Sequence, residues 1–186
     1  MTGTIILLAI IAVVVLFAVG MYNGLVRARN DVGNAWSQID VQLNRRHDLI
    51  PNLVETVKGY MTHERETLEA VVKARQQAVQ ITGGSIEDKA RVENALSQTL
   101  KSLFALSENY PQLRANENFL ALQEELASTE NKISFSRQYY NDSALRLNNK
   151  VEMFPTNLFA TMFNFKKAAF FEVESADVRK PVAVKF

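Results

Sequence analysis

The chain has 186 residues, with 21 lysines and arginines, 20 aspartates and glutamates, and no cysteine. The net charge of +1 argues against nucleic-acid binding, which relies on a clustered basic surface. The absence of cysteine excludes disulfides and thiolate chemistry and suits a cytoplasmic body. With only 7 glycines and 4 prolines, we expect few and long elements.

The first predicted element is an apolar helix over residues 4–22, which contains neither charge nor proline. At ~1.5 Å per residue it is long enough to cross most of a ~30 Å hydrocarbon core, with Tyr22 at interface depth. A cleaved signal peptide is the alternative, with a possible cut at Ala18-Val-Gly20, but no lysine or arginine precedes the apolar run. We predict a retained transmembrane anchor (residues 1–22) that holds a helical bundle (residues 23–186) at the lipid bilayer.

The charges beside this helix predict its orientation. Arg27 and Arg29 follow it closely, and only the α-amino group precedes it. The positive-inside rule therefore places the N terminus outside the cell membrane (the inner membrane) and the body in the cytoplasm.

Beyond the anchor, apolar residues recur at spacings of three and four from Val32 to Ala78. This pattern predicts one long amphipathic helix. Trp36 lies on its apolar stripe and is expected to be buried. Pro51 should kink the helix rather than end it. The pair Gly83-Gly84 is expected to end it with a left-handed C-terminal cap.

Three further helices are predicted. Ser85 is a candidate N-cap for the second helix, which Asn109-Tyr-Pro111 ends. The third carries a stripe from Phe119 to Phe154. Pro155 is expected at the first position of a short fourth helix, 156–163. The tail, 165–186, is expected to lie extended against the bundle. The fold class is therefore all-α: an N-terminal transmembrane helix followed by an antiparallel bundle of long helices.

Polar residues interrupt the apolar stripes of the first and third helices, and charges at such positions are costly unless they are paired. We expect them to pair between helices and to set the register, with Glu130 pairing with Arg46 and Arg137 pairing with Glu64. A polar pocket for a ligand and an oligomer surface remain alternatives. The interrupting residues are Arg46, Glu64, Asn116, Gln123, Glu130 and Arg137.

No enzymatic or metal chemistry can be assigned from the sequence. His47 and His63 are the only histidines, and neither has a second ligand at helical spacing. We predict no catalytic residues, no metal site and no cofactor. The phenylalanine-rich segment 154–171 is interpreted as a cluster that closes the core. A helix that dips into the membrane is the alternative, because Lys166 and Lys167 flank the segment.

Several stretches carry a family resemblance. The longest runs from Ala35 to Tyr60 and contains Trp-Ser-Gln-Ile-Asp-Val-Gln-Leu-Asn-Arg-Arg-His-Asp-Leu-Ile-Pro-Asn-Leu-Val. The others are Tyr22-Asn-x-Leu-Val26, Arg29-Asn30, His63-Glu64, Thr129-Glu-Asn-Lys-Ile133, Arg137-x-x-Tyr-Asn141, Phe154-Pro-x-Asn157 and Pro-x-x-Val-Lys-Phe186. Together they resemble the LemA family of bacterial membrane proteins over nearly the whole chain. The resemblance implies an N-terminal anchor, a soluble helical bundle and no settled biochemical activity. It transfers no catalytic residues.

Three functions compete. The first is a non-enzymatic, membrane-anchored scaffold or adaptor that forms a homo-oligomer or holds unidentified membrane or peripheral proteins. The second is a ligand-binding or sensory bundle that uses the polar residues between its helices. The third is an enzyme, which the lack of a catalytic constellation disfavours. A core pocket lined by Arg46, Glu130 or Arg137 would favour the second. A dry, cross-paired core with an exposed apolar stripe would favour the first.

Overall fold

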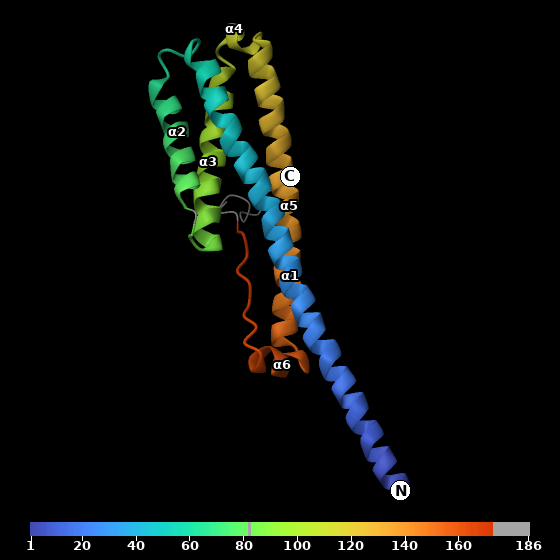
Figure 1. Ribbon diagram of the computed structural model, residues 1–186. Helices are drawn as coiled ribbons and strands as arrows, with labels where there is room; N and C mark the ends of the chain where they lie inside the picture. Colours follow the sequence, from blue (N-terminus) through green and yellow to red (C-terminus); the bar gives the residue numbers. More distant parts are fainter. Residues whose placement is uncertain (82, 173–186) are drawn as a thin grey trace, which may run out of the picture. The chain divides into compact units, whose positions relative to one another are not determined.

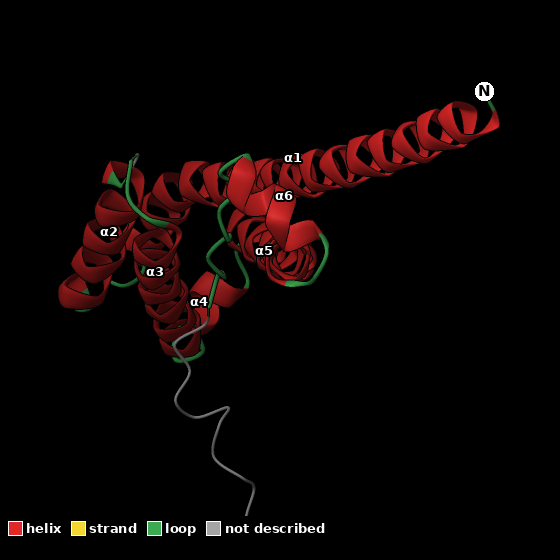
Figure 2. Ribbon diagram, turned by 90° about the horizontal axis from the view of Figure 1, so that it is seen from below, coloured by secondary structure: helices red, strands yellow, loops and turns green. Residues whose placement is uncertain are grey.

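A computed structural model describes residues 1–81 and 83–172 (Figures 1 and 2). Over these residues the chain is all-α, without strands, as the sequence predicts. The helices are α1 (Thr2–Lys58), α2 (Arg65–Gln80), α3 (Ile86–Ser107), α4 (Pro111–Arg114), α5 (Glu117–Glu152) and α6 (Thr156–Met162). The predicted extended conformation of the tail can be followed to residue 172, and the rest of that prediction lies outside the described residues.

The N-terminal part of α1 is the one stretch, within the described part of the chain, that is long and apolar enough to cross a membrane. None of it is buried against the rest of the protein. Large apolar side chains from Ile5 to Val19 are therefore exposed along this part of the helix. A surface of this kind requires an apolar environment outside the protein.

The predicted single helix over 32–82 is wrong, because the chain turns between Lys58 and Arg65. The amides of Tyr60 and Met61 both donate to Val57 O, and the fully buried Met61 side chain fixes the turn in the core. The turn preserves the spacing of the apolar positions, so the stripe continues in phase from α1 into α2. Gly59 is the sequence signal for this turn, because glycine weakens a helix by ~1 kcal/mol relative to alanine.

The ends of the next helices follow local rules. Ser85 Oγ accepts a hydrogen bond from the amide of Asp88 at 3.1 Å, which confirms the predicted N-cap of α3. The predicted left-handed cap at Gly83-Gly84 is wrong, because neither glycine has a positive φ. Gly84 serves another purpose: a Cβ atom there would lie 2.7 Å from Ile81 Cγ2, so any larger residue would force the Ile81 side chain to shift. Pro155 is the N-cap of α6 rather than its first residue.

The described chain forms two compact units, and both α1 and α5 contribute to each. The first unit contains Met1–Asp40 and Ser134–Phe170, and the second contains Val41–Ile133 with Phe171 and Glu172. The predicted division into an anchor (residues 1–22) and a bundle (residues 23–186) remains a prediction.

The first unit packs the part of α1 that follows the apolar stretch against the end of α5, α6 and the segment after α6. Leu25, Ala160 and Phe165 form a small buried cluster. The Trp36 and Tyr140 rings meet edge to face at 5.7 Å, and Trp36 is mostly but not fully buried, in line with the prediction from its position on the apolar stripe. This ring contact joins α1 to α5 within the first unit.

A strap of residues 165–170 closes the first unit along α5. Asn148 Nδ2 donates to Ala168 O at 2.9 Å, and Asn148 Oδ1 accepts from the amide of Ala168 at 2.8 Å. Tyr140 Oη donates to Ala169 O at 2.9 Å. Because Asn148 and Tyr140 are buried, these bonds satisfy polar groups that would otherwise be stranded.

The second unit is a bundle of four helical segments, contributed by α1, α2, α3 and α5, where the sequence predicts three. Most of the predicted stripe positions are buried, but they lie on two helices instead of one. The shared core includes Ile50, Leu53, Val57, Leu68, Val71, Ala74, Leu96, Leu100, Leu103, Phe119 and Leu126. Each of the four segments therefore contributes apolar side chains to one shared core.

Candidate functional site

A buried ion network occupies the core of the second unit. Arg46 lies on the stripe of α1 between Leu43 and Ile50, and the register of the helix therefore turns its guanidinium into the bundle, where it is 1% exposed. We define the ion network as Arg46, His47, Glu93, Ser97 and Glu130. They come from α1, α3 and α5, so three helices must be in register for it to form.

Arg46 is at the centre of the network. Its Nη1 donates to Glu130 Oε2 at 2.7 Å and to Ser97 Oγ at 2.7 Å. Its Nη2 donates to the Glu93 carboxylate. Ser97 Oγ donates in turn to Glu130 Oε1 at 3.0 Å. One guanidinium thus binds two carboxylates, which compensates its desolvation.

His47 extends the network to the second oxygen of Glu93. Its Nε2 lies 2.9 Å from Glu93 Oε1, and His47 and Glu93 are both buried. Burial by itself raises the pKa of the Glu93 carboxyl, because it disfavours the charged form. The hydrogen bond to His47 and the positive charge of Arg46 outweigh burial and hold the pKa of Glu93 below its ordinary value. Glu93 therefore stays ionised in the core.

The predicted pairing of Glu130 with Arg46 is confirmed. Sequence reasoning missed Glu93, although it lies three residues after the buried Ala90 and three before Leu96, a spacing that places it on the buried face of α3. Glu64 accepts a hydrogen bond from Tyr110 Oη at 3.0 Å. Arg137 and Glu64 belong to different units, and their pairing remains a prediction.

The other predicted interruptions lie at the ends and edges of the second unit. Asn116 caps α5, with its Oδ1 accepting from the amide of Phe119 at 2.9 Å and its Nδ2 donating to Tyr60 Oη at 3.1 Å. Gln123 lines a cavity of about 220 Å³ beside the ion network. Arg46, Ser97 and Glu130 also border this cavity, together with the apolar Leu100 and Leu126.

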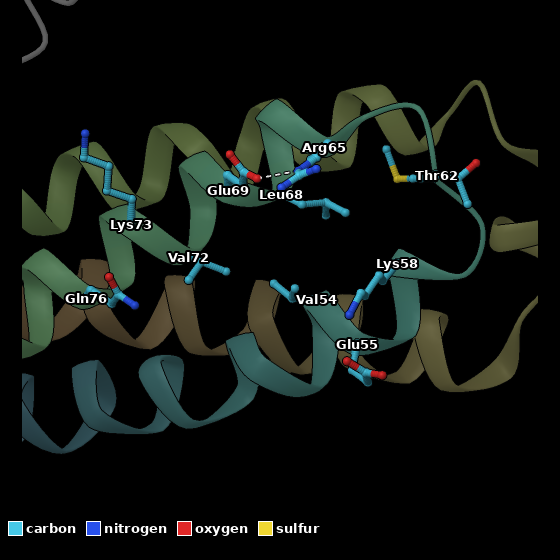
Figure 3. Close-up of a pocket in the computed structure, with 11 residues that line it drawn as sticks. Val54, Glu55, Lys58, Thr62, Arg65, Leu68, Glu69, Val72, Lys73 and Gln76 are labelled. Carbon is cyan, nitrogen blue, oxygen red and sulfur yellow. Dashed lines mark hydrogen bonds and ion pairs between the residues drawn. The ribbon is translucent and has the colours of Figure 1, made fainter.

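A second and larger feature is an open groove of about 990 Å³ between the end of α1 and α2. Val54 on α1 and Val72 on α2 point toward the space between the two helices (Figure 3). Met61 and Leu68 complete the apolar lining. We call this feature the α1–α2 groove. Val72 is 37% exposed, so the groove presents apolar surface to its surroundings.

The rim of the groove carries charges of both signs. Lys58, Arg65 and Lys73 provide positive charge, and Glu55 and Glu69 provide negative charge. Arg65 Nε pairs with Glu69 Oε1 at 2.7 Å, one helical turn away, but both side chains remain exposed. An apolar floor with a mixed rim is typical of grooves that bind an amphipathic helix.

Pro51 and Arg75 join α1 to α2 beside the network. Because Pro51 has no N–H, the carbonyl of His47, four residues earlier, receives no helical hydrogen bond from it. Arg75 Nε donates to that carbonyl at 2.7 Å. Pro51 does not end α1. It leaves the His47 carbonyl free to accept the hydrogen bond from Arg75, and this bond holds α2 against α1.

Neither of the two histidines considered as metal ligands lies in a cluster of metal-ligating residues. His47 belongs to the ion network, and His63 is exposed in the turn before α2. Across residues 1–81 and 83–172, no three His, Asp or Glu side chains are grouped so that they could hold a metal ion.

The chain is similar to one protein family and to several known proteins. The sequence model of the LemA family matches residues 35–186. "Protein LemA" of Metamycoplasma hominis is 29% identical over 166 residues, which cover 86% of this chain and 74% of that protein. "Magnetosome protein MamQ 2" of Paramagnetospirillum magneticum is 22% identical over 179 residues, covering 83% of this chain and 66% of the relative. "Magnetosome protein MamQ" of Magnetospirillum gryphiswaldense is 21% identical with the same coverage.

Proposed function

The chain belongs to the LemA family, and we propose that it is a non-enzymatic, membrane-anchored helical scaffold that self-associates through the α1–α2 groove. The apolar part of α1, residues 4–22, is its anchor in the cell membrane. The N terminus lies outside, and the chain that follows residue 22 lies in the cytoplasm, because Arg27 and Arg29 follow the anchor. The family match and the similarity to the LemA and magnetosome proteins support a membrane-associated role.

The α1–α2 groove is the observation that carries the proposal. Its floor is apolar and open, and its rim combines Lys58, Arg65 and Lys73 with Glu55 and Glu69. A twofold interface brings the same patch of two copies together, so the patch must complement itself. A rim with both signs in nearly equal number meets this requirement. A second copy of this chain is therefore the occupant that we propose.

The ion network supports a structural role for the polar core. Both Nη atoms of Arg46 bind partners within the protein, and Glu93 and Glu130 each accept from it. A catalytic or ligand-binding group keeps donors or acceptors available to its substrate. A network in which both Nη atoms and two carboxylates bind one another instead fixes the register of three helices.

Single cysteines test self-association cleanly, because the chain contains no other cysteine. Two valines form a matched pair: Val72 lies in the groove and is 37% exposed, and Val41 lies outside it on α1 and is 62% exposed. The full chain carrying Val72→Cys, oxidised in native membranes, should give a covalent dimer. Val41→Cys should give much less, although it is more exposed.

A second pair of variants measures the energetics. Val72→Asp should lower the dimer fraction of the full chain in lipid nanodiscs, measured by mass photometry, because it buries a charge in the interface. Val41→Asp should leave the dimer fraction unchanged. Equal crosslinking at both positions, together with a dimer fraction that Val72→Asp does not alter, would exclude the groove as the self-association surface.

A ligand-binding or sensory bundle is the second candidate. The observation in its favour is the 220 Å³ cavity bordered by Arg46, Ser97 and Glu130. Arg46 Nε is buried and has no hydrogen-bond partner among the described residues. Native mass spectrometry of the full chain released from its own membranes tests this candidate. A small molecule bound to the wild type and lost from Leu126→Trp, which fills the cavity, would support it.

A further inference from the structure

The short helix α6 and the residues that flank it present large exposed apolar side chains. Leu158 and Met162, one helical turn apart, are 58% and 73% exposed. Phe154 before the helix and Phe163 after it are 78% and 51% exposed. We call these four residues the α6 patch. Scattered exposed apolar residues are ordinary, but four large ones on and around a seven-residue helix form a contiguous surface.

The inner face of α6 shows where this patch lies within the first unit. Ala160 packs with Leu25 of α1 in a buried cluster. The Phe163 ring meets the Tyr22 ring edge to face at 4.8 Å. Both views of the chain show α6 beside α1 (Figures 1 and 2). The helix is therefore fixed against the residues that immediately follow the apolar span.

The distance from the span can be estimated along α1. Leu25 lies three residues beyond Tyr22, which corresponds to about 4.5 Å of helix rise. The headgroup layer adds roughly 5–7 Å on each side of the hydrocarbon core. A helix packed on residues 22–25 thus lies at headgroup depth whenever residues 4–22 span the membrane.

The charges around the patch also match a lipid surface. The segment from Met153 to Phe165 carries no charged side chain. Lys150 precedes it and Lys166 and Lys167 follow it, and all three lysines are exposed. Lys167 pairs with Glu152, and among the residues that the structure describes Lys150 and Lys166 form no ion pair, so they contribute positive charge beside the patch. An uncharged apolar face flanked by lysines is the pattern of an interfacial helix on anionic lipid.

We propose that the α6 patch inserts into the headgroup layer of the bilayer beside the apolar span, as a second membrane contact of the first unit. This inference rests on the proposed anchor, because α6 reaches the headgroups only if residues 4–22 cross the membrane. Its consequence is that the first unit is held at the bilayer by two contacts, the span and the patch. A single helix can rotate and tilt freely, whereas two contacts fix the orientation of the unit.

A depth measurement tests the proposal on the full chain. A bimane fluorophore is attached to a single cysteine introduced as Leu158→Cys, and the protein is reconstituted into vesicles of phosphatidylcholine and phosphatidylglycerol. Phe135→Cys provides the control, since Phe135 is 73% exposed on α5 of the same unit. Phe135 lies about one turn before Tyr140, which meets Trp36, far along α1 from Tyr22. Val13→Cys reports on the span itself.

Quenching distinguishes lipid, water and protein surroundings. We expect brominated lipids to quench the label at residue 158 several-fold more than iodide does, and the reverse at residue 135. Strong iodide quenching at residue 158 would overturn the inference, and so would protection from both quenchers, which indicates a protein partner on the patch. If the label at residue 13 is itself quenched by iodide, the proposed anchor fails. If iodide quenches the label at residue 158 but not the label at residue 13, the proposed anchor stands and only the inference about the α6 patch fails.

Discussion

The two units of the chain both bury polar side chains, but they satisfy them in different ways. In the first unit, Asn148 and Tyr140 bond to backbone atoms of the strap, and no charged group takes part in these bonds. In the second unit, Arg46 and Glu93 are buried as charges and depend on each other. A neutral amide that loses its partner costs less than a buried charge that loses its partner. The units should therefore differ in their response to substitution and to acid.

The largest effect is expected at Arg46. Arg46→Met leaves Glu93 buried without its cation, which should destabilise the protein by ~3–5 kcal/mol. Replacing both residues, as Arg46→Met with Glu93→Leu, should restore much of the loss, because an apolar pair has no charge to desolvate. Urea unfolding of the full chain in detergent, followed by circular dichroism, measures both variants.

The neighbouring arginine is the control for this prediction. Arg45 pairs with Glu125 at 3.5 Å, with both side chains 50% exposed. Arg45→Met should cost ~0–1 kcal/mol, as exposed pairs do. An equal loss of unfolding free energy in Arg45→Met and Arg46→Met would show that the buried ion pair contributes no more to stability than the exposed one.

A smaller effect is expected at Asn148 in the first unit. Asn148→Ala removes both hydrogen bonds to Ala168 and should cost ~1–3 kcal/mol, in the range for a buried group left without its partner. The amide of Ala168 should then exchange hydrogen faster, as measured by mass spectrometry. Asn149→Ala is the matched control, because the adjacent asparagine is exposed. Equal exchange in the two variants would show that the Asn148 hydrogen bonds do not hold the strap in place.

Acid should weaken the second unit through Glu93. Its pKa is lower in the folded protein than the ordinary value of 4.5, so its contribution to stability is complete above pH 4.5. That contribution is lost as the pH falls below 4.5 and passes through the lower folded-state value. Glu93→Gln should remove this part of the pH dependence. Unfolding curves recorded from neutral to acidic pH would contradict the assignment if both proteins lost stability in parallel.

The smallest effect is expected at Pro51. A proline inside a helix commonly costs ~3 kcal/mol, but here Arg75 already satisfies the carbonyl that the proline leaves free. Pro51→Ala should therefore change stability by less than ~1 kcal/mol. In an Arg75→Met background the same substitution should stabilise the protein more, because the new N–H becomes the only donor to His47 O. Additive effects of the two substitutions in unfolding experiments would show that they do not share this acceptor.

Local rules predict a large part of this fold from the sequence. The N-cap at Ser85 and the stop before Pro111 give α3 nearly its observed bounds. The spacing of apolar residues identifies the buried positions of α1 and α2, including Ile50, Leu53 and Val71. The long uncharged run identifies the part of α1 that could cross a membrane. Each of these signals depends on residues about one helical turn apart or on one continuous apolar run. The sequence therefore reveals them without knowledge of contacts between distant residues.

Only the tertiary structure determines which groups meet across helices. The stripe from Val32 to Ala78 is equally compatible with one helix and with two that fold back, because both bury the same positions. The turn at residues 59–64 brings Arg75 to His47, and the register of α1 against α3 brings Arg46 to Glu93. The α6 patch is exposed because Ala160, and not Leu158, faces Leu25. Periodicity specifies a face for each residue, whereas the partner of that face depends on the packing of helices distant in sequence.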